Sequence, residues 1–164
     1  MTEDIVRASG YLMLGTRLKR IGERLQADVT RIAGLHGQCI AAAHYTVLAA
    51  VDRLGPLTIG ALAEAIGVTQ PGTTRAVGQM VKAGLLTARP GRDDQRRRVV
   101  ALTAKGRRHV DVAKAEIWPG IKAAVADLCA GLNGPLLDQL AQLEDGLTER
   151  PLDQRIGDAH GRKT

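Results

Sequence analysis

Residues 57–106 read LTIGALAEAIGVTQPGTTRAVGQMVKAGLLTARPGRDDQRRRVVALTAKG, and this stretch decides the fold. Its first part predicts a short helix that begins after Thr58, a good N-cap residue, and ends at Gly67. A second helix follows, capped by Thr69 and tolerating Pro71 in its first turn. Two short helices joined by a Gly-containing turn form a helix-turn-helix.

The second helix, which we expect to end at Gly84, has a buried side and an exposed side. The buried stripe has the three- and four-residue spacing of a helix and comprises Thr73, Ala76, Val77, Met80 and Val81. The outer face lacks acids and carries groups that can donate to bases or phosphates, as a helix in the DNA major groove requires. The DNA-contacting residues predicted here are Thr69, Gln70, Thr74, Arg75 and Gln79.

A β-hairpin is predicted after this helix, with strands over residues 85–89 and 99–103. The connection between them is a Pro-Gly turn followed by a basic loop, which contributes Arg92, Asp94, Arg96, Arg97 and Arg98 as further DNA-contacting candidates. A helix-turn-helix with a basic hairpin is a winged helix. The predicted fold class is therefore mainly α, with an α+β winged helix.

Residues 94–106 resemble the wing signature D-x-R-x-x-x-V-x-L-T-x-x-G of the MarR family of bacterial transcriptional regulators. Residues 62–86 are similar to the helix-turn-helix of that family, and the likeness extends over residues 44–148. The resemblance implies a homodimeric repressor that binds double-stranded DNA at a palindromic operator and is released by a small molecule. It also implies that Arg96 enters the minor groove and that Asp94 braces it, although Asp94 could instead only shape the turn.

Charge and composition agree with DNA as the partner. The 164-residue chain has a net charge of +6, and residues 75–108 hold ten Lys and Arg against two Asp, a net charge of +8. Such localised positive charge is typical of a polyanion site. With one Trp, two Tyr and no Phe, a base-stacking platform for single strands is not expected. The sequence predicts no membrane span or signal peptide, and hence a cytoplasmic protein.

Amphipathic helices are predicted on both sides of the winged helix. One continuous helix is expected over residues 4–32, a short one over 43–54, a long one over 104–130 and a last one over 136–147. Pro119 predicts a kink, or a break near Ile117. We expect one subunit over residues 1–150, with the winged helix at 43–106, dimerisation helices at 4–34 and 107–148, and a flexible tail at 151–164.

The sequence offers little for other functions. It contains no catalytic motif, so we expect no enzyme, no catalytic residue, no cofactor and no metal. Two alternatives stay open within the same fold: a redox sensor using Cys39 or Cys129, and a metal sensor using Cys39 with His36, His44 or His109. A winged-helix protein-interaction module that does not bind DNA is a third alternative, against which the +8 charge argues.

The family resemblance also implies a small aromatic or phenolic effector, which enters a cleft between the dimerisation helices and the winged helix. The residues that we expect to line such a cleft are Tyr11, Leu14, Leu18, His44, Leu48 and Trp118. Each of these side chains could instead serve only in core packing or in a dimer contact.

Overall fold

A computed structural model describes residues 2–38, 40–91 and 98–161 of the chain. The structure is mainly helical with one three-stranded sheet, which confirms the predicted α+β winged-helix class. The chain forms two compact units, Met1–Ile121 and Lys122–Thr164, and the boundary falls inside a helix. Among the described residues, no helix combines the length and apolarity needed to cross a bilayer.

The helix-turn-helix has the predicted caps. Helix α4 spans Ile59–Ile66, and the Thr58 hydroxyl accepts a hydrogen bond from the Ala61 amide at its N-terminus. Gly67 ends it with a φ of 65°, a left-handed conformation that glycine adopts without strain. Helix α5 spans Gln70–Lys82 and is capped by Thr69. Both caps are local, and this is why the sequence predicted them.

The hairpin forms with β2 at Leu86–Pro90 and β3 at Arg98–Leu102, each within one residue of its predicted start and end. The two strands are antiparallel, and Leu86 pairs with Leu102. A third strand, β1 at Leu57–Thr58, was not predicted and pairs with the other edge of β3. The sheet order is therefore β1-β3-β2, and β1 places the start of α4 beside the wing.

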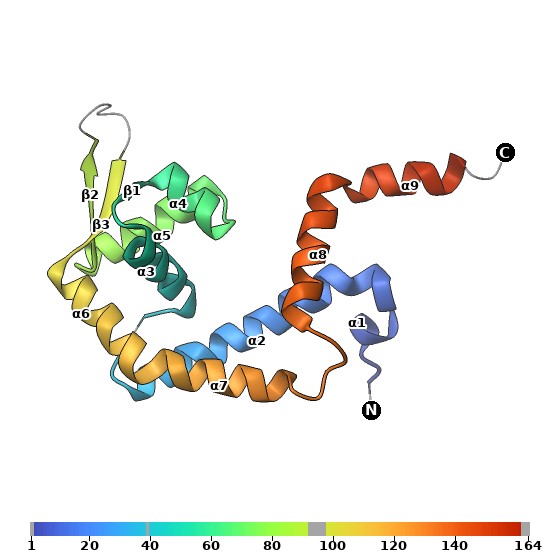
Figure 1. Ribbon diagram of the computed structural model, residues 1–164, viewed down its shortest axis with the longest axis horizontal. Coiled ribbons are helices and arrows are strands. Elements are labelled where there is room, and N and C mark those ends of the chain that lie inside the picture. The colour runs from blue at the N-terminus through green and yellow to red at the C-terminus, as the bar shows by residue number, and fades with distance from the viewer. Residues whose placement is uncertain (1, 39, 92–97, 162–164) are drawn as a thin grey trace. The chain divides into compact units, whose positions relative to one another are not determined.

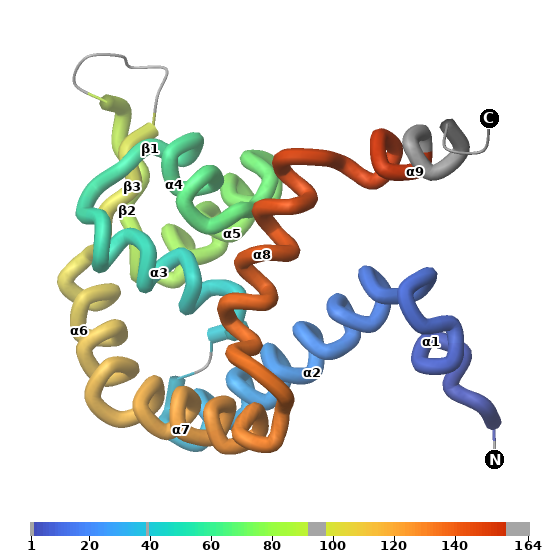
Figure 2. Tube along the Cα trace, turned by 45° about the vertical axis from the view of Figure 1, so that its right-hand side comes forward, coloured from blue at the N-terminus to red at the C-terminus, as the bar shows by residue number. Residues whose placement is uncertain are grey.

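Helix α3 spans Ala42–Leu54 and α6 spans Ala104–Val112. Figures 1 and 2 show α3, α4 and α5 beside the sheet, and the first core cluster is formed by side chains of these helices, of α6 and of the sheet. The cluster is wholly aliphatic apart from sulfur, and its buried members are Val47, Leu48, Val51, Leu62, Val77, Met80, Leu85, Leu86, Val100 and Val110. Of the stripe predicted on α5, Thr73, Val77 and Met80 are buried, but Val81 is 38% exposed. The prediction that Val81 faces inward is wrong because it lies in the last turn, at the edge of that stripe.

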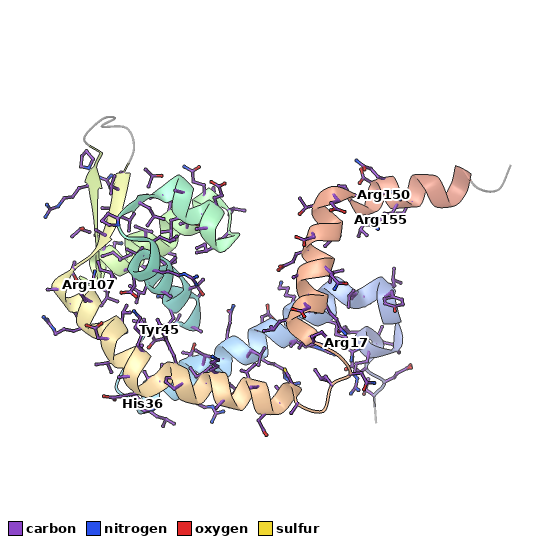
Figure 3. The ribbon with its side chains drawn as sticks, in the orientation of Figure 1. Arg17, His36, Tyr45, Arg107, Arg150 and Arg155 are labelled. Atoms are coloured by element: carbon purple, nitrogen blue, oxygen red, sulfur yellow. The ribbon has the colours of Figure 1, made fainter. Side chains whose placement is uncertain are left out.

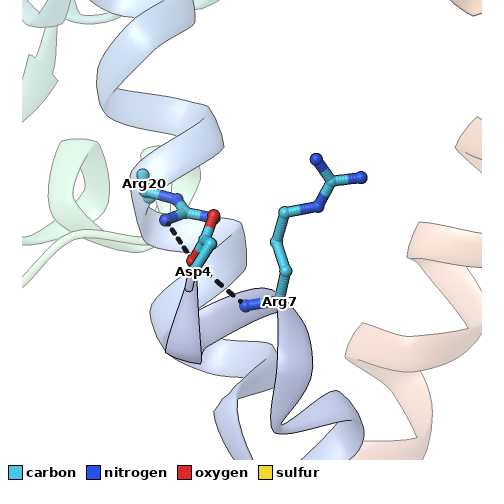
Figure 4. A network of polar contacts seen from close by, with 3 residues as sticks. All are labelled: Asp4, Arg7 and Arg20. Atoms are coloured by element: carbon cyan, nitrogen blue, oxygen red, sulfur yellow. Dashed lines mark hydrogen bonds and ion pairs between the residues drawn. The ribbon is translucent and has the colours of Figure 1, made fainter. Parts of the chain in front are cut away.

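The N-terminal segment is not the single helix that was predicted. It consists of α1 (Ile5–Ala8), a 3₁₀ turn η1 (Gly10–Met13) and α2 (Leu14–Leu35). The break falls at Gly10, whose φ is 53°. Figure 4 shows the contact that folds α1 back: both Asp4 carboxylate oxygens accept from the Arg20 guanidinium at 3.0 Å, and this pairing lowers the pKa of Asp4.

The long helix after the wing is interrupted near Ile117, as predicted. Helix α6 is followed by η2 (Ala113–Ile117), a π-helical turn, and then by α7 (Trp118–Cys129). In that turn the Trp118 amide donates to the Ala113 carbonyl, five residues back. Pro119 lacks an amide hydrogen, and its ring would clash with the carbonyl of Ala115 in a regular helix. A wider turn before Pro119 relieves this clash, so the interruption follows from the sequence.

The second unit ends in two helices, α8 (Leu136–Glu149) and α9 (Leu152–Gly161). Helix α8 was predicted, and the tail expected from residue 151 contains a helix, α9, that was not predicted. Arg155 joins the two helices because its guanidinium donates to the carbonyls of Arg150, at 2.7 Å, and of Gly146. Figure 3 labels both arginines at this corner.

Candidate nucleic-acid interface

The exposed side of α5 carries three of the predicted DNA-contacting residues near its N-terminus. Gln70, Thr74 and Arg75 are exposed, while the opposite side of the helix is buried. The Thr74 hydroxyl donates to the Gln70 carbonyl at 2.8 Å, which fixes the rotamer of the threonine and leaves its oxygen able to accept. These side chains form one polar surface on a helix whose opposite side is packed into the core.

A groove of about 640 Å³ extends this surface across three elements. Gln70 and Thr74 form one side of it, and Arg98 at the start of β3 forms another. The third side is the N-terminal part of α4 with the preceding strand, and its residues are Thr58, Ile59, Gly60, Ala61 and Glu64. The structure thus brings Arg98 of the wing together with two residues of α5, because β1 pairs with β3.

Two predicted contact residues are engaged within the chain. The Thr69 hydroxyl accepts a hydrogen bond from the Gly72 amide at 3.4 Å as the cap of α5. Gln79 lies with its Oε1 2.9 Å from Nε2 of His44, so it links α5 to α3. Four further candidates, Arg92, Asp94, Arg96 and Arg97, lie outside the described residues.

Some of the described basic residues of segment 75–108 are engaged within the chain, and others are exposed. Arg107 lies 3.3 Å from the Asp52 carboxylate, Lys114 beyond the segment forms a second ion pair with Asp52, and Lys105 donates to the Ala83 carbonyl. Figure 3 labels Arg107 on α6. The exposed basic residues that carry positive charge on α5 and the wing strands are Arg75, Lys82, Arg89 and Arg98.

The six candidate effector residues do not gather on one surface of the chain. Tyr11 is 94% exposed in η1, and Leu14 and Leu18 follow it on α2. Leu48 on α3 is completely buried in the first core cluster. Helix α2 has 22 residues and separates η1 from α3, a distance of roughly 30 Å at 1.5 Å per residue.

His44 and Trp118 lie nearer to Leu48. His44 is half-buried on α3, and Trp118 packs against the first core cluster and against a second one. The second core cluster consists of Ala33, Tyr45, Ala113 and Ile117. These contacts assign Leu48 and Trp118 to core packing within the chain.

A buried polar cluster between α3 and α6 was not predicted. The Tyr45 hydroxyl donates to Oε1 of Gln38 at 2.7 Å, and Nε2 of Gln38 lies 3.3 Å from the His109 carbonyl. The rings of Tyr45 and His109 stack with their centroids 5.9 Å apart. Figure 3 labels Tyr45 on α3, near the α6–α7 helix. No local pattern signals this cluster, because its members are up to 71 positions apart in sequence.

His109 is the member of that cluster with an unsatisfied polar atom. Its Nε2 is buried without a hydrogen-bond partner among the described residues. Burial, and to a smaller extent the charge of Lys105, lower the pKa of His109 below its usual 6.5. Both effects favour the neutral form of the imidazole.

The described residues that were considered for metal or redox sensing make separate contacts. Within the described part of the chain, no three His, Cys, Asp or Glu side chains are placed to share a metal ion. His36 lies 3.9 Å from Glu116, and His44 faces Gln79. Cys39 lies outside the described residues, and Cys129 is half-buried at an apolar recess of about 480 Å³ in the second unit.

The comparisons with known proteins agree with the winged helix. A model of the MarR family matches residues 34–97. A mutant of MarR from E. coli, complexed with operator DNA, has 20% identity and a TM-score of 0.66, over 90% of this chain and 98% of its own.

Two further structures are similar. The M. tuberculosis transcriptional regulator MOSR in complex with DNA has 24% identity and a TM-score of 0.67, over 83% of this chain and 95% of its own. The transcriptional repressor CouR, bound to a 23-mer DNA duplex, has 20% identity and a TM-score of 0.68, over 90% of this chain and 99% of its own. These likenesses show that the chain has the fold of these regulators.

Proposed function

We propose that the chain is a regulator of the MarR family, whose model matches residues 34–97, and that it binds double-stranded DNA as a homodimeric transcriptional repressor in the cytoplasm. The observation that carries the proposal is the groove in which Gln70 and Thr74 of α5 face Arg98 of the wing. Side-chain amides and hydroxyls pair with base edges in the major groove, and arginine pairs with guanine or phosphate. The exposed cations of α5 and the wing strands, Arg75, Lys82, Arg89 and Arg98, supply the attraction to phosphate.

Homodimer formation is supported by apolar side chains that a single copy leaves exposed. They concentrate in the segments expected to form the dimer, namely residues 4–34 and 107–148, and the most exposed within these segments are Tyr11, Leu12, Leu128 and Leu137. Each is at least 68% exposed. A two-fold dimer would present two α5 helices to half-sites about 34 Å apart, which implies a palindromic operator. Sedimentation that finds a stable folded monomer at micromolar concentration would rule this assembly out.

The wing completes the proposed interface. Arg96, outside the described residues, enters the minor groove in this proposal, and Asp94 orients it through a paired hydrogen bond. Arg96→Ala should weaken operator binding strongly while leaving the dimer folded. Asp94→Ala should weaken it as well, although it removes a negative charge. Tighter binding by Asp94→Ala would show that repulsion by phosphate outweighs any bracing.

Release by a small aromatic or phenolic ligand is the remaining part of the proposal. It is supported by the match to the MarR family, and the candidate residues are the six named above on η1, α2, α3 and α7. Tyr11 and Leu48 are far apart in one copy of the chain. A cleft lined by residues near Tyr11 and by residues near Leu48 would therefore need the partner subunit. Titration of the protein–operator complex with a panel of phenolic acids tests this part, and unchanged operator affinity throughout the panel would count against it.

The central experiment is selection of duplexes from a random pool, followed by affinity measurements for Arg75→Ala. Loss of one arginine that pairs with a guanine should cost about 1–3 kcal/mol for the selected sequence. Arg24→Ala removes an exposed arginine from α2 and serves as the matched control, with unchanged affinity expected. If Arg75→Ala bound every duplex as well as the unaltered protein does, α5 would not be the reading helix.

A further inference from the structure

The C-terminal end of α5 is held by side chains from the junction between β3 and α6. The carbonyls at the end of a helix lack partners within the helix and need donors from elsewhere. Here the carbonyl of Ala83, the C-cap residue of α5, and the next two carbonyls in the turn after the helix all receive such donors. Lys105 Nζ donates to the Ala83 carbonyl at 2.8 Å, and the Thr103 hydroxyl lies 2.7 Å from the Gly84 carbonyl and 3.2 Å from that of Leu85.

Lys105 acts on α5 through both its charge and its stem. The helix dipole places partial negative charge at the C-terminus, so an ammonium group is favourable there. The stem passes over the turn that ends α5, with the Lys105 Cδ 3.9 Å from the position that a Cβ on Gly84 would take. Since Lys105 belongs to α6, it fixes the direction of α5 relative to another helix.

The junction leaves little freedom for α6 to slide along this turn. The Thr103 amide donates to the Leu85 carbonyl at 3.0 Å, and the same threonine caps α6 by accepting from the Gly106 amide at 2.9 Å. Gly106 packs against the backbone of Leu85 so closely that no side chain fits between them. Any displacement of α6 is therefore passed to the end of α5.

The opposite end of α5 carries Gln70, Thr74 and Arg75. The helix has 13 residues, so the two ends are about 20 Å apart. Its C-terminal half is fixed in the core by Val77 and Met80. A tilt of the helix about these residues thus moves the N-terminal residues in the direction opposite to the C-terminal end.

We propose that Lys105 is a positioning residue for DNA reading: its bond to the Ala83 carbonyl sets the angle at which α5 presents its N-terminal side chains. This inference rests on the proposed function and deepens it. Lys105 belongs to the basic segment, yet its ammonium is directed to a carbonyl of the protein. It therefore contributes to the choice of sequence rather than to general attraction by phosphate.

The test compares Lys105→Met, which keeps the unbranched stem and removes the ammonium, with Arg108→Met. Arg108 is exposed on the same helix three positions later, so the control loses the same charge. The full-length protein is titrated with its selected duplex and with a random duplex over a range of salt concentrations. We expect Lys105→Met to lower the ratio of the two affinities about tenfold, the effect of one hydrogen bond from a charged donor. The ratio should be unchanged in Arg108→Met.

Salt dependence separates positioning from a phosphate contact. If Lys105 bound phosphate, Lys105→Met would weaken both duplexes equally and make the slope of log K against log salt shallower by about 0.9. That outcome would overturn the proposal. Lys105→Arg retains a donor at this end of α5 and should keep most of the affinity ratio, and failure of this rescue would also count against the proposal. Circular dichroism verifies that each variant is folded.

A measurement without DNA keeps the two proposals distinguishable. The amides of Gly84 and Leu85 donate to the carbonyls of Val81 and Met80, at 3.0 and 2.9 Å. In Lys105→Met their hydrogen exchange should be about tenfold faster, and in Arg108→Met unchanged. Unchanged exchange in Lys105→Met overturns the positioning role whatever the DNA result. If the unaltered protein binds no duplex in a salt-dependent way, the proposed function fails together with the reading role.

Discussion

Replacing Gly106 with alanine should destabilise the winged helix more than any other single methyl group added to a helical glycine of the first unit. A Cβ at this position would lie far inside 3.0 Å of the Leu85 carbonyl oxygen, a distance below which real Cβ atoms are essentially never found. It would also lie 3.0 Å from the Leu85 carbonyl carbon and 3.2 Å from Leu102 Cδ2. The carbonyl cannot retreat freely, because it accepts hydrogen bonds from the Thr103 amide and hydroxyl.

The expected cost combines three effects. Overpacking a fixed site costs about 1–3 kcal/mol, and weakening the two hydrogen bonds to Leu85 costs about 1 kcal/mol each. Replacing Gly by Ala inside a helix stabilises the folded state by about 1 kcal/mol. The net loss in the free energy of unfolding is thus about 2–4 kcal/mol, or a decrease of about 1–2 M in the urea midpoint.

Urea unfolding followed by far-ultraviolet circular dichroism, at one fixed protein concentration, measures this loss. Gly78→Ala is the matched control, because a Cβ on Gly78 in α5 would meet no atom within 4 Å. This control should be stabilised by up to about 1 kcal/mol. If Gly106→Ala unfolded at the same midpoint as Gly78→Ala, the close packing of α6 on Leu85 would be refuted.

Three further predictions concern pH, charge and capping. Because the pKa of His109 is lowered in the folded state, the unfolded state takes up the proton first, so stability should fall as pH drops below 6.5; urea midpoints of His109→Gln should fall less over this range. Asp52→Asn leaves Arg107 and Lys114 without their shared anion. Since both cations are about half exposed, the free energy of unfolding should fall by only about 1 kcal/mol, and a double-mutant cycle with Arg107→Met measures the share of the Asp52–Arg107 pair. Thr69→Ala removes the cap of α5 and should lower the stability measured by thermal unfolding by about 1 kcal/mol, whereas Thr69→Ser should keep it. An unchanged stability in Thr69→Ala would show that the 3.4 Å bond contributes nothing.

Local signals made the helix-turn-helix predictable from the sequence. Thr58 and Thr69 cap helices through bonds to amides three residues away, and Gly67 ends a helix through its own φ. The interruption before Pro119 likewise depends on residues within one turn. For the same reason Gln70 and Thr74 could be assigned to the outer face of α5 without knowledge of the tertiary structure.

Features that depend on distant partners could not be predicted in this way. Strand β1 has two residues and exists because β3, more than 40 positions later, pairs with it. The apolar periodicity continues through Gly10, so the fold-back of α1 becomes apparent only with the pairing of Asp4 and Arg20. In the candidate site, the proximity of Arg98 to Gln70 and the engagement of Gln79 by His44 both arise from tertiary contacts.

The position of Trp118 gives the molecule an intrinsic optical probe. The chain has no other tryptophan, so selective excitation of the indole yields emission from one known place. That place is the start of α7, where the indole packs against both core clusters. Its emission maximum and its quenching by iodide report how tightly the first core cluster packs against the second. Both can be measured in the unlabelled protein, in the presence or absence of a duplex.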